Sequence, residues 1–269
     1  MLASAVVTIA AFVAVGSAAG GSSRSVLRLD WRSGTNAAFS TLECPNPDEH
    51  FRIVRNPTRT GRPVARFTVS ERDRWVDGVV RCLDANYTTA ETVGETFFYG
   101  FSLYVPRPGL SNNLIWELHQ PESLWSVRGC GLAPYALIVE DNEMRFRIST
   151  GNCVVGRGNV HRELNIPIPT LETYPRNRWI DFVIRISFSE RDGSVDLWSR
   201  TVGQRWPTQP QVQRRHIPTL PYCSSCNVHN VKLYTEMGLY PGTSRYRGSD
   251  MIYLAGSHRG PTFQAVAPR

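Results

Sequence analysis

The sequence has a single lysine, Lys232, so almost all of its cationic side chains are arginines. It has no clustered basic run and no nucleic-acid-binding motif, which speaks against nucleic acid as a partner despite a formal net charge of +7. After residue 20 no apolar stretch is long enough to cross a bilayer, so we expect no membrane association of the mature chain. Because guanidinium groups suit carboxylates, sulfates and phosphates, the positive excess favours a polyanionic partner.

Helical periodicity is also scarce, and there is no internal repeat or low-complexity segment. Instead, short β-rich runs recur between proline, glycine and asparagine residues, which predicts an all-β, antiparallel sandwich in one domain. The predicted strands cover residues 25–31, 51–54, 64–69, 79–83, 96–105, 113–119, 135–140, 144–150, 179–188, 194–198, 231–240 and 251–253. In 179–188, the alternate residues Ile180, Phe182, Ile184, Ile186 and Phe188 are predicted to enter the core. Asp192-Gly193 predicts a hairpin turn, and residues 207–221 are predicted to form a long polar loop that could overhang a cleft.

The N-terminal segment is an apolar run that ends in small residues. We interpret residues 1–19 as a signal peptide, 20–24 as a flexible lead and 25–269 as the mature domain, which predicts secretion. No Lys or Arg precedes the apolar run, so a membrane anchor is the alternative interpretation.

Six cysteines behind an export signal favour disulfides over metal binding. The pairing cannot be derived from sequence, but chain order suggests Cys44–Cys82, Cys130–Cys153 and Cys223–Cys226 as the least tangled arrangement. The lone C-x-x-C at Cys223 is interpreted as a loop staple, not as a redox or zinc motif. We expect no metal and no cofactor; calcium at Asp192 and Asp196 is the alternative to ordinary turn and strand aspartates.

The stretch 231–240 alternates two chemically different faces with a period of two, which predicts a strand. One face suits a core and carries Val231, Leu233, Thr235, Met237 and Leu239. The other sets two phenols, a cation and a carboxylate around a glycine: Lys232, Tyr234, Glu236, Gly238 and Tyr240. This second face would line a groove or, alternatively, cover an edge strand of a sandwich.

A second informative strand covers residues 113–119. Its period of two places Ile115, Glu117 and His119 on one side, opposite Trp116 and Leu118. A carboxylate two residues from a histidine can tune the imidazole for proton transfer, although the same pair is also an ordinary surface feature.

The order of these features resembles the jelly-roll polysaccharide lyases, in particular the heparin lyase I and glucuronan lyase relatives and, more distantly, the alginate lyases. The resemblance rests on the Arg81 strand, Tyr99-Gly-Phe-Ser-Leu-Tyr-Val-Pro106, Trp116-Glu-Leu-His119, Trp179-Ile-Asp-Phe-Val-Ile and Tyr234-x-x-x-Gly238-x-Tyr240. It covers residue 25 to the end and implies a concanavalin-like jelly roll, here with disulfide staples.

The resemblance also implies a set of site residues. His119, Tyr234 and Arg81 fall on the positions that carry catalysis in those families. Glu117 stands where they have glutamine, with Gln120 as a neighbouring substitute, and Glu236 stands where the alginate lyases have lysine. Residues predicted to contact substrate are Glu117, Gln120, Lys232, Glu236 and Tyr240.

The expected activity is β-elimination on an acidic, uronate-containing polysaccharide by a secreted monomer. Arg81 would neutralise the uronate carboxylate, and Tyr234 would act as the acid. The base would be His119, or Tyr234 itself if Lys232 or Arg81 lowers its pKa. Two alternatives are a catalytically silent carbohydrate-binding module and a retaining glycoside hydrolase, which needs two carboxylates about 5 Å apart, often in a Glu-x-Asp-x-Glu run that this sequence lacks.

Overall fold

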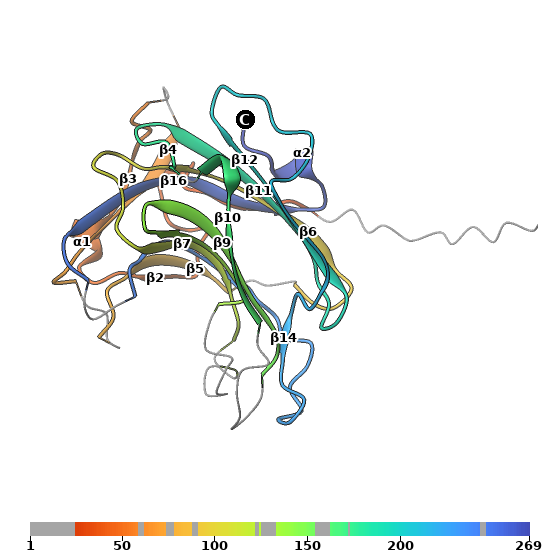
Figure 1. Ribbon diagram of the computed structural model, residues 1–269. Helices are drawn as coiled ribbons and strands as arrows, with labels where there is room; N and C mark the ends of the chain where they lie inside the picture. The colour runs from red at the N-terminus through yellow and green to blue at the C-terminus, as the bar shows by residue number, and fades with distance from the viewer. Residues whose placement is uncertain are drawn as a thin grey trace, which may run out of the picture.

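The computed structural model describes residues 25–58, 62–73, 78–87, 91–121, 124, 133–153, 162–171, 173–242 and 246–269. The predicted signal peptide, the lead and Cys130 lie outside these ranges. Within them the chain forms two antiparallel sheets that lie face to face, as predicted (Figure 1). No helix in the described ranges has the length and apolar character needed to cross a membrane.

The first sheet has eight strands in the order β13-β12-β11-β6-β16-β4-β3, with β1 paired to β16. Their bounds are β1 Leu27–Leu29, β3 Phe51–Arg55, β4 Pro63–Ser70, β6 Thr96–Tyr104, β11 Trp179–Ser187, β12 Gly193–Thr201, β13 Val212–Ile217 and β16 Ser249–Gly260. The short helices α1 (Pro47–His50) and α2 (Phe263–Val266) flank this sheet.

The second sheet also has eight strands, in the order β10-β9-β8-β7-β15-β5-β2, with β14 paired to β9. Their bounds are β2 Thr41–Glu43, β5 Cys82–Asn86, β7 Asn113–His119, β8 Tyr135–Glu140, β9 Glu143–Asn152, β10 Arg162–Pro167, β14 Pro221–Tyr222 and β15 Tyr234–Tyr240. A 3-10 helix, η2 (Pro169–Leu171), follows β10.

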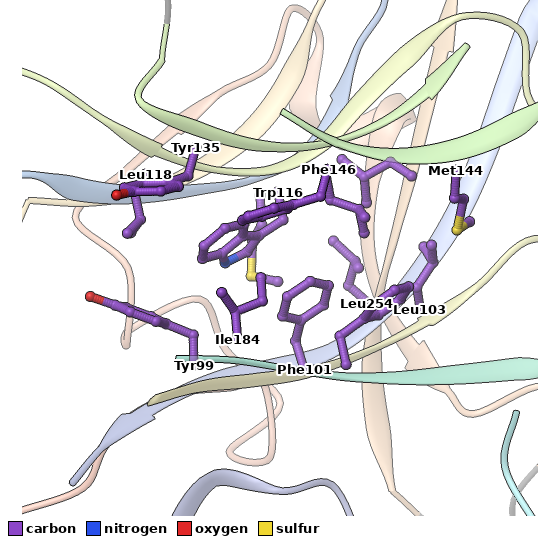
Figure 2. Close-up of a cluster of buried hydrophobic side chains, with 14 of the residues drawn as sticks. Tyr99, Phe101, Leu103, Trp116, Leu118, Tyr135, Met144, Phe146, Ile184 and Leu254 are labelled. Atoms are coloured by element: carbon purple, nitrogen blue, oxygen red, sulfur yellow. The ribbon is translucent and has the colours of Figure 1, made fainter. Parts of the chain in front are cut away.

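The core fills the space between the sheets with side chains from alternate strand positions. Figure 2 shows Phe101 of β6 and Trp116 of β7 meeting there, with ring centroids 5.5 Å apart and nearly parallel planes. The ring of Phe182 on β11 also stacks on Phe101, with centroids 5.1 Å apart. The predicted apolar faces of 179–188 and 231–240 are confirmed as core faces, with Thr235 buried among them.

Two sequence predictions about strands are wrong. Ile115 belongs to the core and not to the face of Glu117 and His119, because the pairing of β7 with β8 shifts register between Leu114 and Trp116. Such a bulge reverses the side-chain alternation locally. Residues 207–221 contain strand β13, which pairs with β12 at the edge of the first sheet, so they do not form one long loop.

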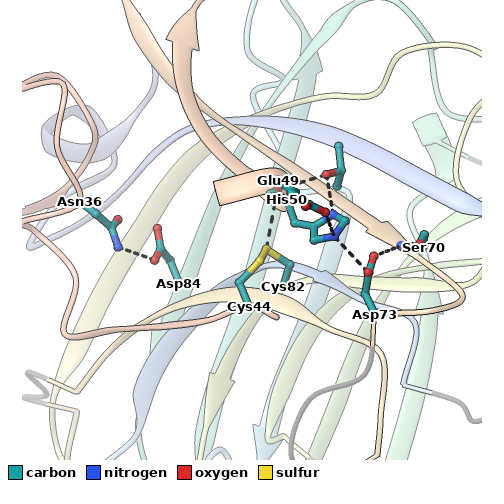
Figure 3. Close-up of a disulfide and its surroundings, with 9 residues drawn as sticks. Asn36, Cys44, Glu49, His50, Ser70, Asp73, Cys82 and Asp84 are labelled. Atoms are coloured by element: carbon teal, nitrogen blue, oxygen red, sulfur yellow. Dashed lines mark hydrogen bonds and ion pairs between the residues drawn. A yellow bond between two sulfur atoms is a disulfide. The ribbon is translucent and has the colours of Figure 1, made fainter. Parts of the chain in front are cut away.

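The disulfides Cys44–Cys82 and Cys223–Cys226 are confirmed. Cys44 directly follows β2 and Cys82 begins β5, so the first disulfide ties an edge strand to its neighbour. Figure 3 shows it beside His50, whose Nε2 lies 3.0 Å from Oδ1 of Asp73. The third predicted pair falls on Cys130, outside the described residues.

Asp84 lies on the core side of β5, where Asn36 Nδ2 donates to it at 2.7 Å and Trp31 Nε1 at 3.1 Å. It is completely buried, and this burial raises its pKa to about 7, against the opposing effect of the two hydrogen bonds.

Candidate functional site

The outer face of the second sheet brings together most of the residues singled out from the sequence. Tyr234 on β15 lies opposite His119 on β7, and Glu236 lies opposite Glu117. The alternation predicted for 231–240 turns Tyr234 and Glu236 away from the core, into which Met237 and Leu239 of the same strand pack.

Tyr234 and His119 form the first contact pair of the site. The Tyr234 hydroxyl lies 3.2 Å from Nδ1 of His119, and the ring centroids are 5.3 Å apart. Nδ1 also lies 2.8 Å from the backbone carbonyl oxygen of Gln120. If Nδ1 carries the proton, its N–H donates a hydrogen bond to that carbonyl. The imidazole lone pair is then on Nε2, which is the nitrogen suited to act as a base.

Protonation of Tyr234 is favoured by its surroundings. Burial raises the pKa of its phenol far above the ordinary value of 10.0, and the charges of Glu236 and Glu117 add to the effect. Lys232 lies exposed ahead of β15 and does not offset this. A phenol that stays protonated in this way is suited to donate a proton.

Glu117 and Glu236 form the second contact pair. Glu117 is 2% exposed and Glu236 is 5% exposed, and their carboxyl groups are hydrogen-bonded to each other. No N–H or hydroxyl among the described residues donates to the buried Oε1 of Glu117. Two ionised carboxylates cannot form such a bond, so the pair holds a proton, and burial together with Glu117 raises the pKa of Glu236 well above 4.5.

Arg81 lies directly before β5, on the far side of β15 from His119. Its Nε is 3.2 Å from Oε2 of Glu43, and its guanidinium carbon is 5.9 Å from the centroid of the Tyr240 ring. Glu43 and Arg81 precede Cys44 and Cys82 in the chain, so the disulfide that joins β2 to β5 also fixes the backbone of this ion pair.

Tyr87, which follows β5, completes this side of the site. It is 45% exposed, its ring centroid lies 4.7 Å from that of Tyr234, and its hydroxyl donates to Oε1 of Glu43 at 3.2 Å. An exposed ring beside a proton donor is a suitable platform for a sugar.

A pocket of about 380 Å³ opens on the other side of the carboxyl pair. Glu117, His119, Tyr240 and Arg147 line it, over the apolar side chains of Leu114 and Ile138. Of the predicted substrate contacts, Gln120 is completely buried and contributes its carbonyl to His119, and Lys232 stands apart from the pocket.

Three residues of this face were missed by sequence reasoning: Glu43, Tyr87 and Arg147. The outward position of Arg147 could have been predicted, because it alternates with the core residues Phe146 and Ile148 in a predicted strand. Glu43 did not, since its strand is only three residues long.

A second pocket, of about 290 Å³, lies on the outer face of the first sheet. Its described lining includes Arg28, Asp30 and His258 but no tyrosine, so it lacks the paired phenol and imidazole of the second sheet.

No group of three or more metal-ligating side chains occurs within the described ranges. Of the two aspartates considered for calcium, Asp196 lies 2.6 Å from Arg215 and 3.0 Å from Arg185, and Asp192 lies 2.9 Å from His216.

Comparison with known proteins supports the resemblance seen in the sequence. No curated protein matches the chain. Among solved structures, an endo-β-1,4-glucuronan lyase from the fungus Trichoderma reesei is similar with a TM-score of 0.64 and 14% identity, over 86% of this chain and 98% of that one. Alginate lyase vAL-1 from Chlorella virus is similar with a TM-score of 0.52 and 9% identity, over 88% and 99%. These likenesses confirm the jelly-roll fold.

The family assignment comes from the sequence match. The family model described as "Polysaccharide lyase" matches residues 31–253, which include both sheets' central strands and every residue of the Tyr234–His119 and Glu117–Glu236 pairs. The chain therefore belongs to the polysaccharide lyase family.

Proposed function

We propose that this protein cleaves a uronate-containing polysaccharide by β-elimination. The observation that carries the proposal is the 3.2 Å contact between the Tyr234 hydroxyl and His119 on the open face of the second sheet. It provides a proton donor and a proton acceptor side by side, within a family of polysaccharide lyases.

The reaction requires one proton to leave the substrate and another to enter it. His119 takes the proton from C5 of the uronate, the bond between C4 and the glycosidic oxygen breaks, and a C4–C5 double bond forms. Tyr234 gives its phenolic proton to the leaving oxygen. The raised pKa of Tyr234 suits this role, because the phenol stays protonated until the leaving oxygen develops charge.

Proton removal places further negative charge on the uronate carboxylate, so a cation or hydrogen-bond donor must face it. Arg81 supplies a guanidinium that Glu43 and the Tyr240 ring hold in a fixed orientation. Tyr87, exposed beside Tyr234, would support the sugar ring.

The same site argues against hydrolysis. Retaining glycosidases hold their two carboxyl groups about 5 Å apart and inverting ones hold them farther apart, so that a sugar or a water fits between them. Glu117 and Glu236 are instead in direct hydrogen-bonding contact.

We further propose that the protein acts outside the cell as a monomer. The disulfides Cys44–Cys82 and Cys223–Cys226 support an oxidising location, where such bonds persist.

The experiment is a time course of ultraviolet absorbance with the purified protein and a panel of glucuronan, alginate, heparin and chondroitin. The unsaturated uronate product absorbs, whereas hydrolysis products do not. A rise on one polymer that is lost in Tyr234→Phe supports β-elimination and names the substrate. Binding of the polymers without any rise would favour the silent binding module, and cleavage into saturated fragments would favour a hydrolase.

A further inference from the structure

One row of residues crosses the outer face of the second sheet from the carboxyl pair to a cation. The register places Glu236 opposite Glu117, Glu117 opposite Ala136, and Ala136 opposite Arg147. Neighbouring strands lie about 4.8 Å apart, so the backbones of Glu117 and Arg147 are roughly 10 Å from each other. The residue between them in this row is Ala136, whose side chain is a methyl group.

Arg147 differs from the other arginine on its face of β9. Arg145, two residues earlier, is bound by Glu143 at 2.9 Å and by Glu140 at 3.5 Å. The Nε of Arg147 is buried without an acceptor among the described residues, although Arg147 lines the 380 Å³ pocket. Arg147 as a whole is only partly buried, but a buried N–H without an acceptor is costly unless a ligand supplies one.

The opposite wall of this pocket is formed by the carboxyl pair. Glu117 lines the pocket, is 2% exposed, and receives no N–H or hydroxyl at Oε1 from the described residues. The proton of the pair is used in the bond between Glu117 and Glu236, so Oε1 of Glu117 can accept a hydrogen bond, such as one from a sugar hydroxyl. The pocket thus offers a cation on one side and a hydrogen-bond acceptor on the other.

We propose that this pocket is a subsite for a uronate next to the one that reacts, with Arg147 as the cation for its carboxylate and Oε1 of Glu117 as the acceptor for one of its hydroxyl groups. This inference rests on the proposed function and extends it. Arg147 lies two strands away from His119 on β7, so it holds a neighbouring sugar and takes no part in proton transfer. Substrates with a carboxylate on consecutive sugars would use both Arg81 and Arg147.

The charged and titratable groups that face the pair come from each strand around it. They are Glu43 from β2, Arg81 and Tyr87 at the ends of β5, Tyr234 from β15, His119 from β7 and Arg147 from β9. Arg81, held by Glu43, serves the reacting uronate in the proposed function, and Arg147 is the arginine that lines the pocket.

The test compares Arg147→Gln with Arg145→Gln on glucuronan. We expect Arg147→Gln to raise KM about tenfold or more while kcat stays within about twofold, because hydrogen bonds to charged groups contribute that much to binding. Arg145→Gln changes a residue on the same strand and face that does not line the pocket. Its partner Glu140 does line the pocket, but the 3.5 Å ion pair is partly solvent-exposed and weak, so both constants should stay within about twofold. Equal KM values for the two variants would overturn the subsite, and a loss confined to kcat would place Arg147 at the reacting sugar and overturn it too.

A binding measurement separates this proposal from the proposed function. In the Tyr234→Phe background, calorimetric titration with glucuronan fragments should show affinity lowered about tenfold by Arg147→Gln and unchanged by Arg145→Gln. Glu117→Gln keeps an acceptor oxygen in its amide and should retain affinity, whereas Glu117→Ala should lose it. If the wild type releases no unsaturated product but the titration shows these differences, the proposed function fails and the subsite stands. If Arg147→Gln binds the fragments with unchanged affinity, the subsite is refuted whatever the activity assay shows.

Discussion

Glu117 and Glu236 lie directly opposite each other on neighbouring strands, and their buried carboxyl groups are hydrogen-bonded. Such a bond requires a proton, which the folded protein retains under conditions where the unfolded chain has released it. The pair therefore couples the stability of the fold to pH.

The sign of this coupling follows from the raised pKa of Glu236. Its stabilising contribution is fully present below the unfolded pKa of about 4.5 and is lost as the pH rises through the folded pKa, at up to about 1.4 kcal/mol per pH unit. Glu236→Gln removes the titrating group. We expect the melting temperature of this variant, relative to that of the wild type, to increase as the pH rises from about 4.5 to about 8.

Thermal unfolding of both proteins across this pH range checks the prediction. Asp84, with a pKa of about 7, changes the free energy of unfolding with pH in the same direction. It is present in both proteins, so its effect cancels when their melting temperatures are subtracted. Glu49→Gln, at a carboxylate whose side chain is 74% exposed, serves as the matched control. Parallel curves for the wild type and Glu236→Gln would show that the pair holds no extra proton.

The assignment of acid and base predicts different behaviour for two variants. Tyr234→Phe removes the phenolic proton but keeps the ring contacts with Tyr87 and His119, so kcat should fall about 10²–10⁴-fold at an unchanged melting temperature.

His119→Ala removes the base and leaves space for an imidazole. A similar fall in kcat is expected, with partial recovery when imidazole is added to the assay. The same addition should not restore Tyr234→Phe, which lacks the acid. Recovery of both variants, or of neither, would contradict the division of roles.

Local alternation made much of the fold predictable. The period of two in 179–188 and 231–240 determines which side chains enter the core, and the structure confirms both core faces. Ile115 was misplaced because a bulge depends on the partner strand, which the sequence of β7 does not contain. Strand β13 was missed because an edge strand with the sequence Val-Gln-Arg-Arg-His-Ile has a largely polar composition.

The site was predictable along each strand but not across strands. Glu117 with His119, and Tyr234 with Glu236, follow from alternation within one strand. The contact between Glu117 and Glu236, however, depends on the register of two strands far apart in the chain. The ion pair of Arg81 with Glu43 depends likewise on β2, and both contacts set the charge of the site.

Gly238 is predicted to be intolerant of a side chain. Its φ is +149°, and a Cβ there would lie 2.2 Å from the carbonyl oxygen of Cys82 on β5. Backbone strain and steric overlap together should make Gly238→Ala cost about 2–5 kcal/mol of unfolding free energy. Gly203, with a φ of +97° and no atom within 4 Å of its added Cβ, provides a control that should cost only about 1–2 kcal/mol.

Urea denaturation of the two alanine variants measures this difference. An equal loss of unfolding free energy in both variants would mean that the backbone of β5 shifts easily at Cys82. The close approach of β15 and β5 would then not constrain the site.

The disulfides Cys44–Cys82 and Cys223–Cys226, both within the described part of the chain, should differ in their effect on stability and activity. Cys44–Cys82 closes a sequence separation of 38 residues, so replacing both cysteines by serine should cost about 4 kcal/mol, whereas the separation of 3 in Cys223–Cys226 corresponds to about 2 kcal/mol. Only the first adjoins the site, because Glu43 and Arg81 are the chain neighbours of its cysteines.

Loss of Cys44–Cys82 should therefore also raise KM for the uronate polymer, because the edge strand that carries Glu43 is then held to β5 by hydrogen bonds alone. The Cys223 and Cys226 double variant should keep the wild-type KM. Assays at a temperature where both variants remain folded separate this effect from unfolding. If KM is unchanged in the first variant, the β2–β5 pairing itself holds the Arg81–Glu43 ion pair, and the disulfide serves stability alone.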